Sequence, residues 1–337
     1  MKKLNKDLFN KSFSHIYIEK QAKNHPNTQK IISHFANSNI IEINHYKDVF
    51  CRSHQNFYLQ KQSPNLILAI KTDNLIYKGA RFCNDFGNDH FYYTSSIMNC
   101  IYNCEYCYLQ GMYPSANIVI FVNIEDIFHK VEGILNKHSM YLCISYDTDI
   151  LALEQITQYT SKWIDFCKKH DNLKIEIRTK SSNFNAIKDI TPTDNVILAW
   201  TLSPSLISQK YEDKTPNLRS RLYSINQAIK NNWNVRICFD PILYLRDFKK
   251  NYKDLIDTTF STIPPNKILD LSIGVFRVSS EYLKTMRKNR FDSIILNYPF
   301  MCKNKEYTYD ENLSKEMISY VYNLSKKYID EDKIYIS

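Results

Sequence analysis

From residue 90 onward, short runs of β-branched and aromatic residues alternate with longer stretches of helical character. Such alternation is typical of parallel βα units, in which each helix returns the chain to the start of the next strand. Strands are expected at 90–96, 117–123, 140–146, 174–180, 196–203, 234–242 and 269–276. Helices are expected at 124–137, 152–169, 217–231, 249–262 and 311–328. The pattern predicts an α/β barrel of the TIM type, whose functional residues follow the carboxyl ends of the strands.

The first 90 residues have a separate pattern, with strands expected at 13–19 and 66–71 and a helix at 27–37. We interpret this segment as a small N-terminal α/β cap. The expected domains are therefore 1–90, the cap, and 91–337, the barrel with a C-terminal helix. A chain of 337 residues exceeds a typical single domain, although an α/β barrel can use this length alone.

Composition favours a soluble enzyme in the cytoplasm. No stretch approaches the about 18 apolar residues of a membrane span, and no apolar run of a signal peptide follows the basic N-terminus. Nine cysteines without a secretion signal are expected to be thiols and metal ligands. The net charge of +9 is compatible with binding to nucleic-acid phosphates. An AT-rich genome also gives a Lys- and Asn-rich composition, so the positive net charge can have this origin instead.

Cys100, Cys104 and Cys107 form a C-x3-C-x2-C motif in the loop after the first predicted barrel strand. Thiolates are the usual ligands of iron–sulfur clusters, and three cysteines leave one iron of a four-iron cluster open. An open iron can bind a small molecule, and this spacing resembles that of radical S-adenosylmethionine enzymes. The alternatives are three buried thiols, or a zinc site with Cys83 or His90 as the fourth ligand.

Polar side chains follow the predicted barrel strands. The chain has only five glycines, and no Gly-Gly-Glu follows the second strand. Hydroxyl groups there can hold a cofactor carboxylate or ribose, and a cation can pair with the carboxylate. Each of these side chains can also be an ordinary cap, turn or solvated strand end. The residues are Ser145, Tyr146, Asp147, Thr148, Asp149, Arg178, Thr179, Lys180, Thr201, Ser203 and Asp240.

The chain resembles the spore photoproduct lyase family within the radical S-adenosylmethionine superfamily. The most specific stretch is Cys-Glu-Tyr-Cys-Tyr-Leu-Gln at 104–110, and further matches lie at 118–123, 125–127, 148–154, 178–180 and 240–242. The resemblance implies a partial (β/α)6 barrel that holds a [4Fe-4S] cluster and S-adenosyl-L-methionine. It implies a lyase that reverses an ultraviolet thymine dimer in DNA by means of a 5′-deoxyadenosyl radical. The implied partners are DNA with a thymine photoproduct and a low-potential electron donor of the flavodoxin or ferredoxin type.

Residue by residue, the resemblance implies roles for the positions that match the family. The three motif cysteines would ligate the cluster. The side chains of Thr148, Lys180 and Thr201 and the main chain of Tyr108 and Asp240 would contact S-adenosylmethionine. Thr148 and Thr201 stand where serines are expected, which keeps the hydroxyl group. Tyr106 and Tyr108 match tyrosines of the family's hydrogen-atom relay, although both can simply pack beside the cluster.

Two departures from the family concern the substrate. Tyr146 stands where the family has its hydrogen-donating cysteine, and its phenol can donate a hydrogen atom instead. Cys143 lies three residues earlier, so strand alternation predicts that it faces the opposite way. The family's Gly-Arg-Tyr-Gly hairpin, which inserts into DNA, is replaced by Tyr-Pro-Phe-Met-Cys-Lys-Asn-Lys at 298–305.

Three hypotheses follow. The chain is a lyase acting on damaged DNA, or a radical enzyme of the same family acting on RNA or a small molecule, or a metal-containing nucleic-acid-binding protein without catalysis. The basic segment 277–290 is a candidate for contact with a nucleic-acid partner. Its residues Lys284, Arg287 and Lys288 have helical i, i+3, i+4 spacing and would share a face. That face is expected either to bind phosphates or to be an ordinary solvated surface.

Overall fold

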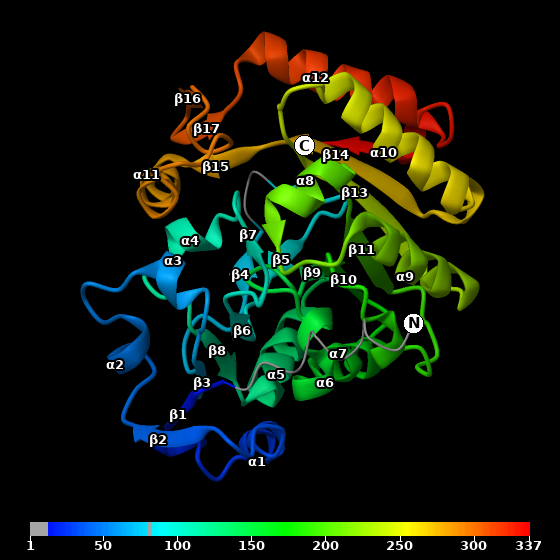
Figure 1. The fold of residues 1–337 in the computed structure, drawn as a ribbon. Coiled ribbons are helices and arrows are strands. Elements are labelled where there is room, and N and C mark those ends of the chain that lie inside the picture. The colour runs from blue at the N-terminus through cyan, green and yellow to red at the C-terminus, as the bar shows by residue number, and fades with distance from the viewer. Residues whose placement is uncertain (1–12, 80–82) are drawn as a thin grey trace.

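A curled sheet of eight strands forms the frame of the molecule (Figure 1). The computed structural model describes residues 13–79 and 83–337. The strand order is β18-β14-β13-β11-β10-β9-β5-β4, and every pair is parallel except β4 with β5. The bounds are β4 (Tyr77–Lys78), β5 (Phe91–Tyr93), β9 (Met140–Cys143), β10 (Leu173–Thr179), β11 (Val196–Thr201), β13 (Asn234–Ile242), β14 (Asp270–Val275) and β18 (Ile334–Ile336).

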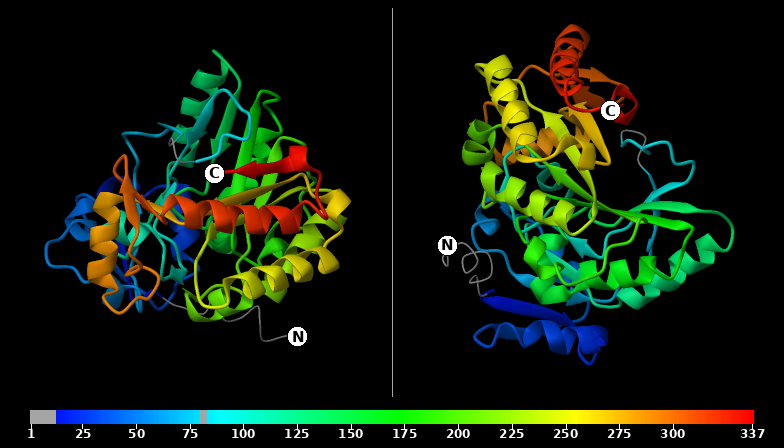
Figure 2. Two further views of the ribbon diagram at one scale, coloured as in Figure 1. Left: turned by 90° about the horizontal axis from the view of Figure 1, so that it is seen from above. Right: turned by 90° about the vertical axis from the view of Figure 1, so that its right-hand side faces the viewer.

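Helices cover the outer face of this sheet (Figures 1 and 2). Each helix turns an apolar stripe toward the strands, as in α5, where Ile127, Val131 and Leu135 are buried at spacings of four residues. The longer helices are α5 (Ile124–Leu135), α7 (Tyr159–Cys167), α9 (Leu218–Lys230), α10 (Phe248–Thr262) and α12 (Glu311–Ser325). The predicted partial (β/α)6 barrel is thus confirmed, with β5, β9, β10, β11, β13 and β14 as its six parallel strands.

A second sheet of five strands has the order β2-β1-β3-β8-β6. Its strands are β1 (His15–Glu19), β2 (Asn39–Ile43), β3 (Leu66–Ala69), β6 (Ile97–Met98) and β8 (Ile118–Phe121). The sheet joins strands from both sides of residue 90. In Figure 2 its N-terminal strands lie at the opposite end of the molecule from α10 and α12.

The prediction that 117–123 is a barrel strand was wrong, because β8 pairs with β3 and β6 rather than with β5 or β9. Two asparagines fasten β8 to β3 at its ends. Asn117 Oδ1 accepts from the backbone N–H of Asn65 at 2.9 Å. Asn123 accepts from the N–H of Lys71 at 2.8 Å and donates to the carbonyl of Lys71 at 2.9 Å. These side-chain bonds satisfy backbone groups beyond the four-residue strands.

The helix predicted at 152–169 is interrupted. A 3-10 turn η2 (Leu151–Leu153) and α6 (Glu154–Thr157) precede α7, and Gln158 between them has a left-handed φ of 55°. The cause is Glu154, whose carboxylate accepts from the backbone N–H groups of Thr160 and Ser161 at 2.7 and 3.0 Å. This carboxylate caps a new helix N-terminus, so the chain turns before α7 begins.

The remaining elements are short. Predicted elements at the N-terminus are confirmed as β1, β3 and α1. Helix α11 (Ser280–Asn289) has ten residues. The shorter helices are α1 (Pro26–Ile32), α2 (Lys47–Phe50), α3 (Phe57–Gln60), α4 (Leu109–Met112), α8 (Ser205–Lys210), η1 (Lys20–Ala22), η3 (Phe184–Ala186), η4 (Pro265–Lys267) and η5 (Glu331–Lys333). The short strands are β7 (Asn103–Cys104), β12 (Glu212–Asp213), β15 (Arg277–Ser279), β16 (Met301–Lys303) and β17 (Glu306–Thr308).

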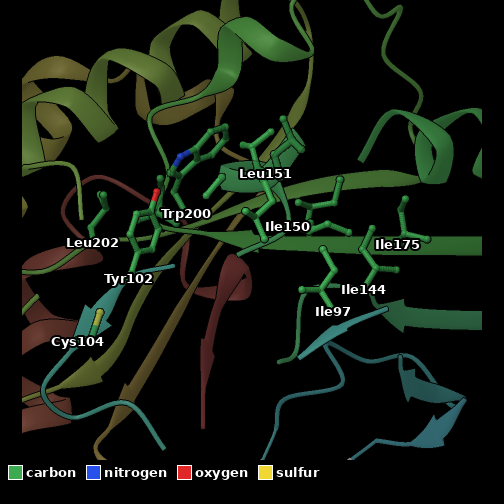
Figure 3. Packing of buried hydrophobic residues seen from close by; sticks show 14 of the residues in the cluster. Ile97, Tyr102, Cys104, Ile144, Ile150, Leu151, Ile175, Trp200 and Leu202 are labelled. Carbon is green, nitrogen blue, oxygen red and sulfur yellow. The ribbon is translucent and has the colours of Figure 1, made fainter. Parts of the chain in front are cut away.

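The main core lies between the barrel sheet, the helices and the second sheet. Figure 3 shows part of it, with Tyr102 and Cys104 at one end beside Trp200 and Leu202. The cysteine motif therefore rests directly on the packed interior. Within residues 13–79 and 83–337, no helix has the length and apolar character needed to cross a membrane.

Candidate active site

The segment 100–107, here called the cysteine loop, follows β5 and β6 and is fixed to the other side of the barrel by a short strand pair. In this pair β7 runs antiparallel to β12, with Cys104 opposite Glu212 and Asn103 opposite Asp213. The backbone N–H of Glu105 also donates to the carbonyl of Tyr211 at 2.7 Å. The position of the cysteines thus depends on a segment that is more than a hundred residues away in the chain.

A buried ion pair anchors this strand pair. The side chains of Glu212 and Arg221 are both fully buried and bonded to each other. Arg221 also donates to the carbonyl of Thr201 at 3.1 Å, and Glu212 accepts from Tyr106 Oη and from Ser203 Oγ. Burial alone would raise the pKa of Glu212, but Arg221 and nearby Lys180 lower it to about 2. Glu212 is therefore a stable carboxylate, as such a pair requires.

Two lysines lie against the cysteine loop. Lys61 is buried, donates to the carbonyl of Cys100 and interacts electrostatically with all three motif cysteines. Lys180 interacts with Cys104 and Cys107 and lies 5.6 Å from the centre of the Tyr106 ring. Burial would lower the pKa of Lys180, but Cys104 and Glu212 outweigh this effect and raise it.

The three cysteines fit a cluster of several irons. Burial raises the pKa of Cys104 and raises that of Cys100 to about 11, and Cys107 lies close enough to act electrostatically on both. The neighbouring lysine cations favour the thiolate forms that ligation requires. In a four-iron cluster each thiolate binds a different iron, so the sulfurs need not converge on one point. The donor chemistry and the two cations thus match the predicted ligands Cys100, Cys104 and Cys107.

The residues named as a fourth zinc ligand lie elsewhere. Cys83 Sγ is 4.0 Å from the hydroxyl of Tyr146, and the His90 ring lies 3.9 Å from that of His138. In the part of the chain that the structure describes, no three His, Cys, Asp or Glu side chains are grouped as ligands of one metal ion. A single zinc ion needs such a group.

Polar groups at the ends of β9 and β10 face the cysteine loop. Asp149 is buried and accepts from Thr179 Oγ1 at 2.7 Å and from the backbone N–H of Lys180 at 2.7 Å, which fixes the end of β10. Thr148 Oγ1 is buried and has no hydrogen-bond partner among the described residues. A buried hydroxyl without a partner is unfavourable, and a bound polar molecule would satisfy it. Thr201, at the end of β11, is also buried.

Tyr146 lies at the centre of an aromatic group beside the cysteine loop. Its ring stacks on Tyr93 at 4.1 Å and lies 5.9 Å from the ring of Tyr108. The hydroxyl of Tyr108 donates to the carbonyl of Tyr146 at 2.6 Å. Tyr93 continues the stack onto Tyr77 at 4.8 Å. Burial raises the pKa of Tyr146 and Tyr108, so both are protonated phenols near neutral pH.

The hydroxyl of Tyr146 points toward Cys83, which sequence reasoning had considered only as a zinc ligand. The prediction that Cys143 faces the opposite way from Tyr146 rested on strand alternation. Since β9 ends at Cys143, strand alternation does not extend to residue 146. The thiols of Cys143 and Cys83 interact electrostatically, and Arg178 influences both. The one thiol that lies against the phenol of Tyr146 among the described residues is that of Cys83.

Asp240 lies between two arginines inside the barrel. Its carboxylate is 3.1 Å from Arg277 and 3.4 Å from Arg178. Burial would raise the pKa of Asp240, but the arginines lower it. The side chain is thus occupied by ion pairs, which is consistent with the prediction that only its main chain contacts a cofactor.

The basic segment differs from the expectation of one shared phosphate-binding face. Residues 280–289 form the predicted helix, α11, in which Lys284 and Lys288 are exposed. Arg287 instead donates to the carbonyls of Leu296 and Tyr298 at 2.7 and 2.9 Å. Its guanidinium satisfies backbone acceptors of the following loop, so Arg287 is structural.

A hairpin exists where the family motif is replaced. Strands β16 and β17 pair antiparallel, and the two residues between them, Asn304 and Lys305, have positive φ angles of 53° and 66°. Two such residues make the tight turn that matches the twist of hairpin strands. Met301 on β16 is 59 % exposed, and Lys303 and Lys305 are exposed.

Sequence reasoning missed the residues that connect distant segments. The roles of Lys61, Glu212 and Arg221 beside the cysteine loop have no local signal, because each depends on a partner from another part of the chain. Cys83 had a signal in its residue type, but its neighbour Tyr146 is 63 positions away. Hydrogen-bond partners of this kind become visible only in the folded chain.

Fold and site together define a partial-barrel protein with a three-cysteine loop at the ends of its strands. The family model described as spore photoproduct lyase matches residues 12–304. The chain therefore belongs to the spore photoproduct lyase family. A search of curated proteins found no match.

Two solved structures illustrate the shared fold. A spore photoproduct lyase complexed with dinucleoside spore photoproduct has a TM-score of 0.81 at 16% identity, and the match covers 97% of this chain and 99% of that chain. A spore photoproduct lyase double mutant with bound AdoMet and dinucleoside spore photoproduct has a TM-score of 0.80 at 16% identity, covering 96% of this chain and 97% of that chain. At this identity the likeness shows the fold.

Proposed function

We propose that this protein is a radical S-adenosylmethionine lyase that reverses a thymine photoproduct in DNA. The observation that carries the proposal is Lys180, which follows β10 and interacts with Cys104 and Cys107 of the cysteine loop. Thr148, with its unpartnered hydroxyl, follows the neighbouring strand β9. Family membership and the ligands of the two solved neighbours support the substrate class. The cluster and S-adenosyl-L-methionine supply a 5′-deoxyadenosyl radical when bound.

Different residues of the chain bind the cluster and S-adenosyl-L-methionine. Cys100, Cys104 and Cys107 hold the cluster, and Lys61 and Lys180 offset its negative charge. Lys180 and Thr148 suit the carboxylate and polar groups of the cofactor, because one offers a cation and the other a free hydroxyl. Thr201 and the main chain of Tyr108 and Asp240 complete the predicted contacts.

The hydrogen atom that completes repair has two candidate sources at the site. A substrate radical becomes a closed-shell product when a thiol or phenol gives it one hydrogen atom, which leaves the radical on sulfur or oxygen. Tyr146 occupies the position of the family's donor, and the thiol of Cys83 lies 4.0 Å from its hydroxyl. Tyr108 and Tyr106 match the family's hydrogen-atom relay, and each hydroxyl already donates a hydrogen bond, that of Tyr108 to the Tyr146 carbonyl and that of Tyr106 to Glu212.

The hairpin of β16 and β17 supports DNA as the partner. An enzyme acting on a base in a duplex must unstack it, and an exposed apolar side chain can act as the wedge. Met301 is such a side chain, and Lys303 and Lys305 can contact phosphates. A hairpin with exposed apolar and basic side chains at 301–305 therefore supports DNA as the proposed partner.

A second candidate is a radical enzyme of the same family that acts on RNA or a small molecule. Two observations favour it, namely Tyr146 in place of a cysteine and the absence of Gly-Arg-Tyr-Gly from residues 298–305. Both differences concern groups that meet the substrate, whereas the cofactor site is retained. A binding protein without catalysis would need neither an open iron nor an unpartnered hydroxyl at the strand ends.

The test is anaerobic reconstitution with iron and sulfide, followed by reduction in the presence of S-adenosyl-L-methionine and a dinucleotide thymine photoproduct. We expect formation of 5′-deoxyadenosine and of the repaired dinucleotide. Cofactor cleavage without repair of the dinucleotide or of photoproduct-containing duplex DNA would support the second candidate. A reconstituted protein that binds no cluster would refute the enzyme assignment.

A further inference from the structure

Four large apolar side chains form an exposed patch on one side of the molecule. Tyr58 and Leu59 belong to α3, and Leu59 is 63 % exposed. Phe291 and Ile294 follow α11 and are 83 % and 63 % exposed. The guanidinium of Arg290 lies 4.9 Å from the centre of the Tyr58 ring and joins the two segments. We call Tyr58, Leu59, Phe291 and Ile294 the outer patch. Side chains of this size gathered at one place mark an interaction site more often than scattered ones do.

The outer patch lies next to the cysteine loop. Arg290 donates to Asn103, the neighbour of Cys104, and to Gln110 at 3.2 Å. On the other segment, Lys61 directly follows α3 and donates to the carbonyl of Cys100. Figure 1 shows α3, α4 and α11 in succession along this side, and α11 packs against α4. Arg290 and Lys61, which flank the two halves of the patch in the chain, are therefore each bonded to the cysteine loop.

The surroundings of the outer patch are basic. Residues 280–290 contain four basic side chains and one acidic one. In residues 52–61 the exposed Arg52 is basic, Lys61 is buried, and no residue is acidic. Lys284 and Lys288 are exposed on α11, while Asp292 is an exposed acid within the patch. The balance of charge around these apolar residues favours an acidic partner. Clustered surface charge of one sign speeds the encounter with a partner of the other sign, and the effect weakens with salt.

We propose that the outer patch is the docking face for a small acidic electron-carrier protein of the flavodoxin type. The proposal rests on the proposed function, because the cluster must receive one electron for each cleavage of S-adenosyl-L-methionine. The reduced carrier loses one electron, and the cluster gains it. Transient redox complexes bury small interfaces, and a few apolar side chains within a charged surround suit such a contact. The position of the patch over the cysteine loop keeps the transfer path short.

The experiment compares Leu59→Glu and Phe291→Glu with Ile40→Glu. Ile40 is 56 % exposed on β2, at the edge of the second sheet, and serves as the matched control. Binding of a purified acidic flavodoxin is measured by titration at low and high salt. Formation of 5′-deoxyadenosine is measured with reduced flavodoxin and, separately, with dithionite. A negative charge in the patch repels an acidic carrier, so we expect at least tenfold weaker flavodoxin binding and slower flavodoxin-driven cleavage.

Dithionite-driven cleavage should be unchanged in both patch variants, and Ile40→Glu should behave as the wild type throughout. Wild-type affinity for flavodoxin in both patch variants would overturn the proposal. So would a loss of duplex-DNA binding with unchanged flavodoxin binding, because the patch would then be a nucleic-acid surface. If dithionite drives no cleavage in the wild type, the proposed function fails, and the binding titration still decides whether the patch docks the carrier.

Discussion

Replacing Glu212 by Gln should destabilise the protein strongly, although the substitution keeps the shape of the side chain. Glu212 and Arg221 are fully buried and bonded to each other, and Glu212 also accepts from Tyr106 and Ser203. Glutamine can still accept these two hydroxyl hydrogens, but it carries no charge. The variant thus leaves the guanidinium of Arg221 buried without its counter-ion, which is the costly case for a buried pair.

The magnitude follows from the buried ion pair. Removing one partner of a buried ion pair costs about 3–5 kcal/mol. The pKa of Glu212 is about 2 in the folded protein, against 4.5 ordinarily, and this difference corresponds to about 3 kcal/mol of stabilisation. Because the folded-state pKa is the lower one, this stabilisation is present above pH 4.5 and is lost as the pH falls toward 2. For a chain of this size, about 3–5 kcal/mol corresponds to a fall in Tm of about 4–7 °C.

The assay is thermal unfolding of wild type and Glu212→Gln at pH 7, followed by circular dichroism, together with the iron content after reconstitution. Iron content should also fall, because Glu212 is the strand partner of Cys104. Asp213→Asn is the control, since the Asp213 side chain is exposed and accepts one hydrogen bond, from Asn103. A Tm of Glu212→Gln within about 2 °C of the wild type would refute the reasoning, as would an equal loss in Asp213→Asn.

Three further outcomes are expected. Cys104→Ala should lose most bound iron and all cofactor cleavage. The control Cys302→Ala, on the exposed hairpin, should keep both. Undiminished iron in Cys104→Ala would contradict the ligand assignment. Thr148→Val should weaken S-adenosyl-L-methionine binding by about five- to tenfold for one lost hydrogen bond, and Thr148→Ser should restore it; equal dissociation constants would exclude the contact. Tyr146→Phe and Cys83→Ala should each retain cofactor cleavage, and the one that removes the terminal donor should lower repair or divert the products; unchanged products in both would place the donor elsewhere.

The barrel strands and the cysteine loop could be predicted from the sequence because their signals are local. The predicted strand at 234–242 coincides with β13, and β10 and β11 differ from their predicted bounds by only one or two residues. A strand that is buried on both faces has a continuous run of apolar residues. A helix that packs on the sheet has apolar residues at every third or fourth position. The motif spacing likewise needs only neighbouring residues. These features determined the fold class and the candidate ligands.

Pairing between distant segments was decided only by the tertiary structure. β8 has the same apolar character as a barrel strand, yet Asn117 and Asn123 bond it to β3 in the second sheet. The same holds for Cys83, whose neighbour Tyr146 follows a different strand. A side chain's type can be read locally, but its partners depend on which surfaces the folded chain brings together. The sequence therefore determined the elements and the chemistry of the cysteine loop, while the tertiary structure decided which residues surround it.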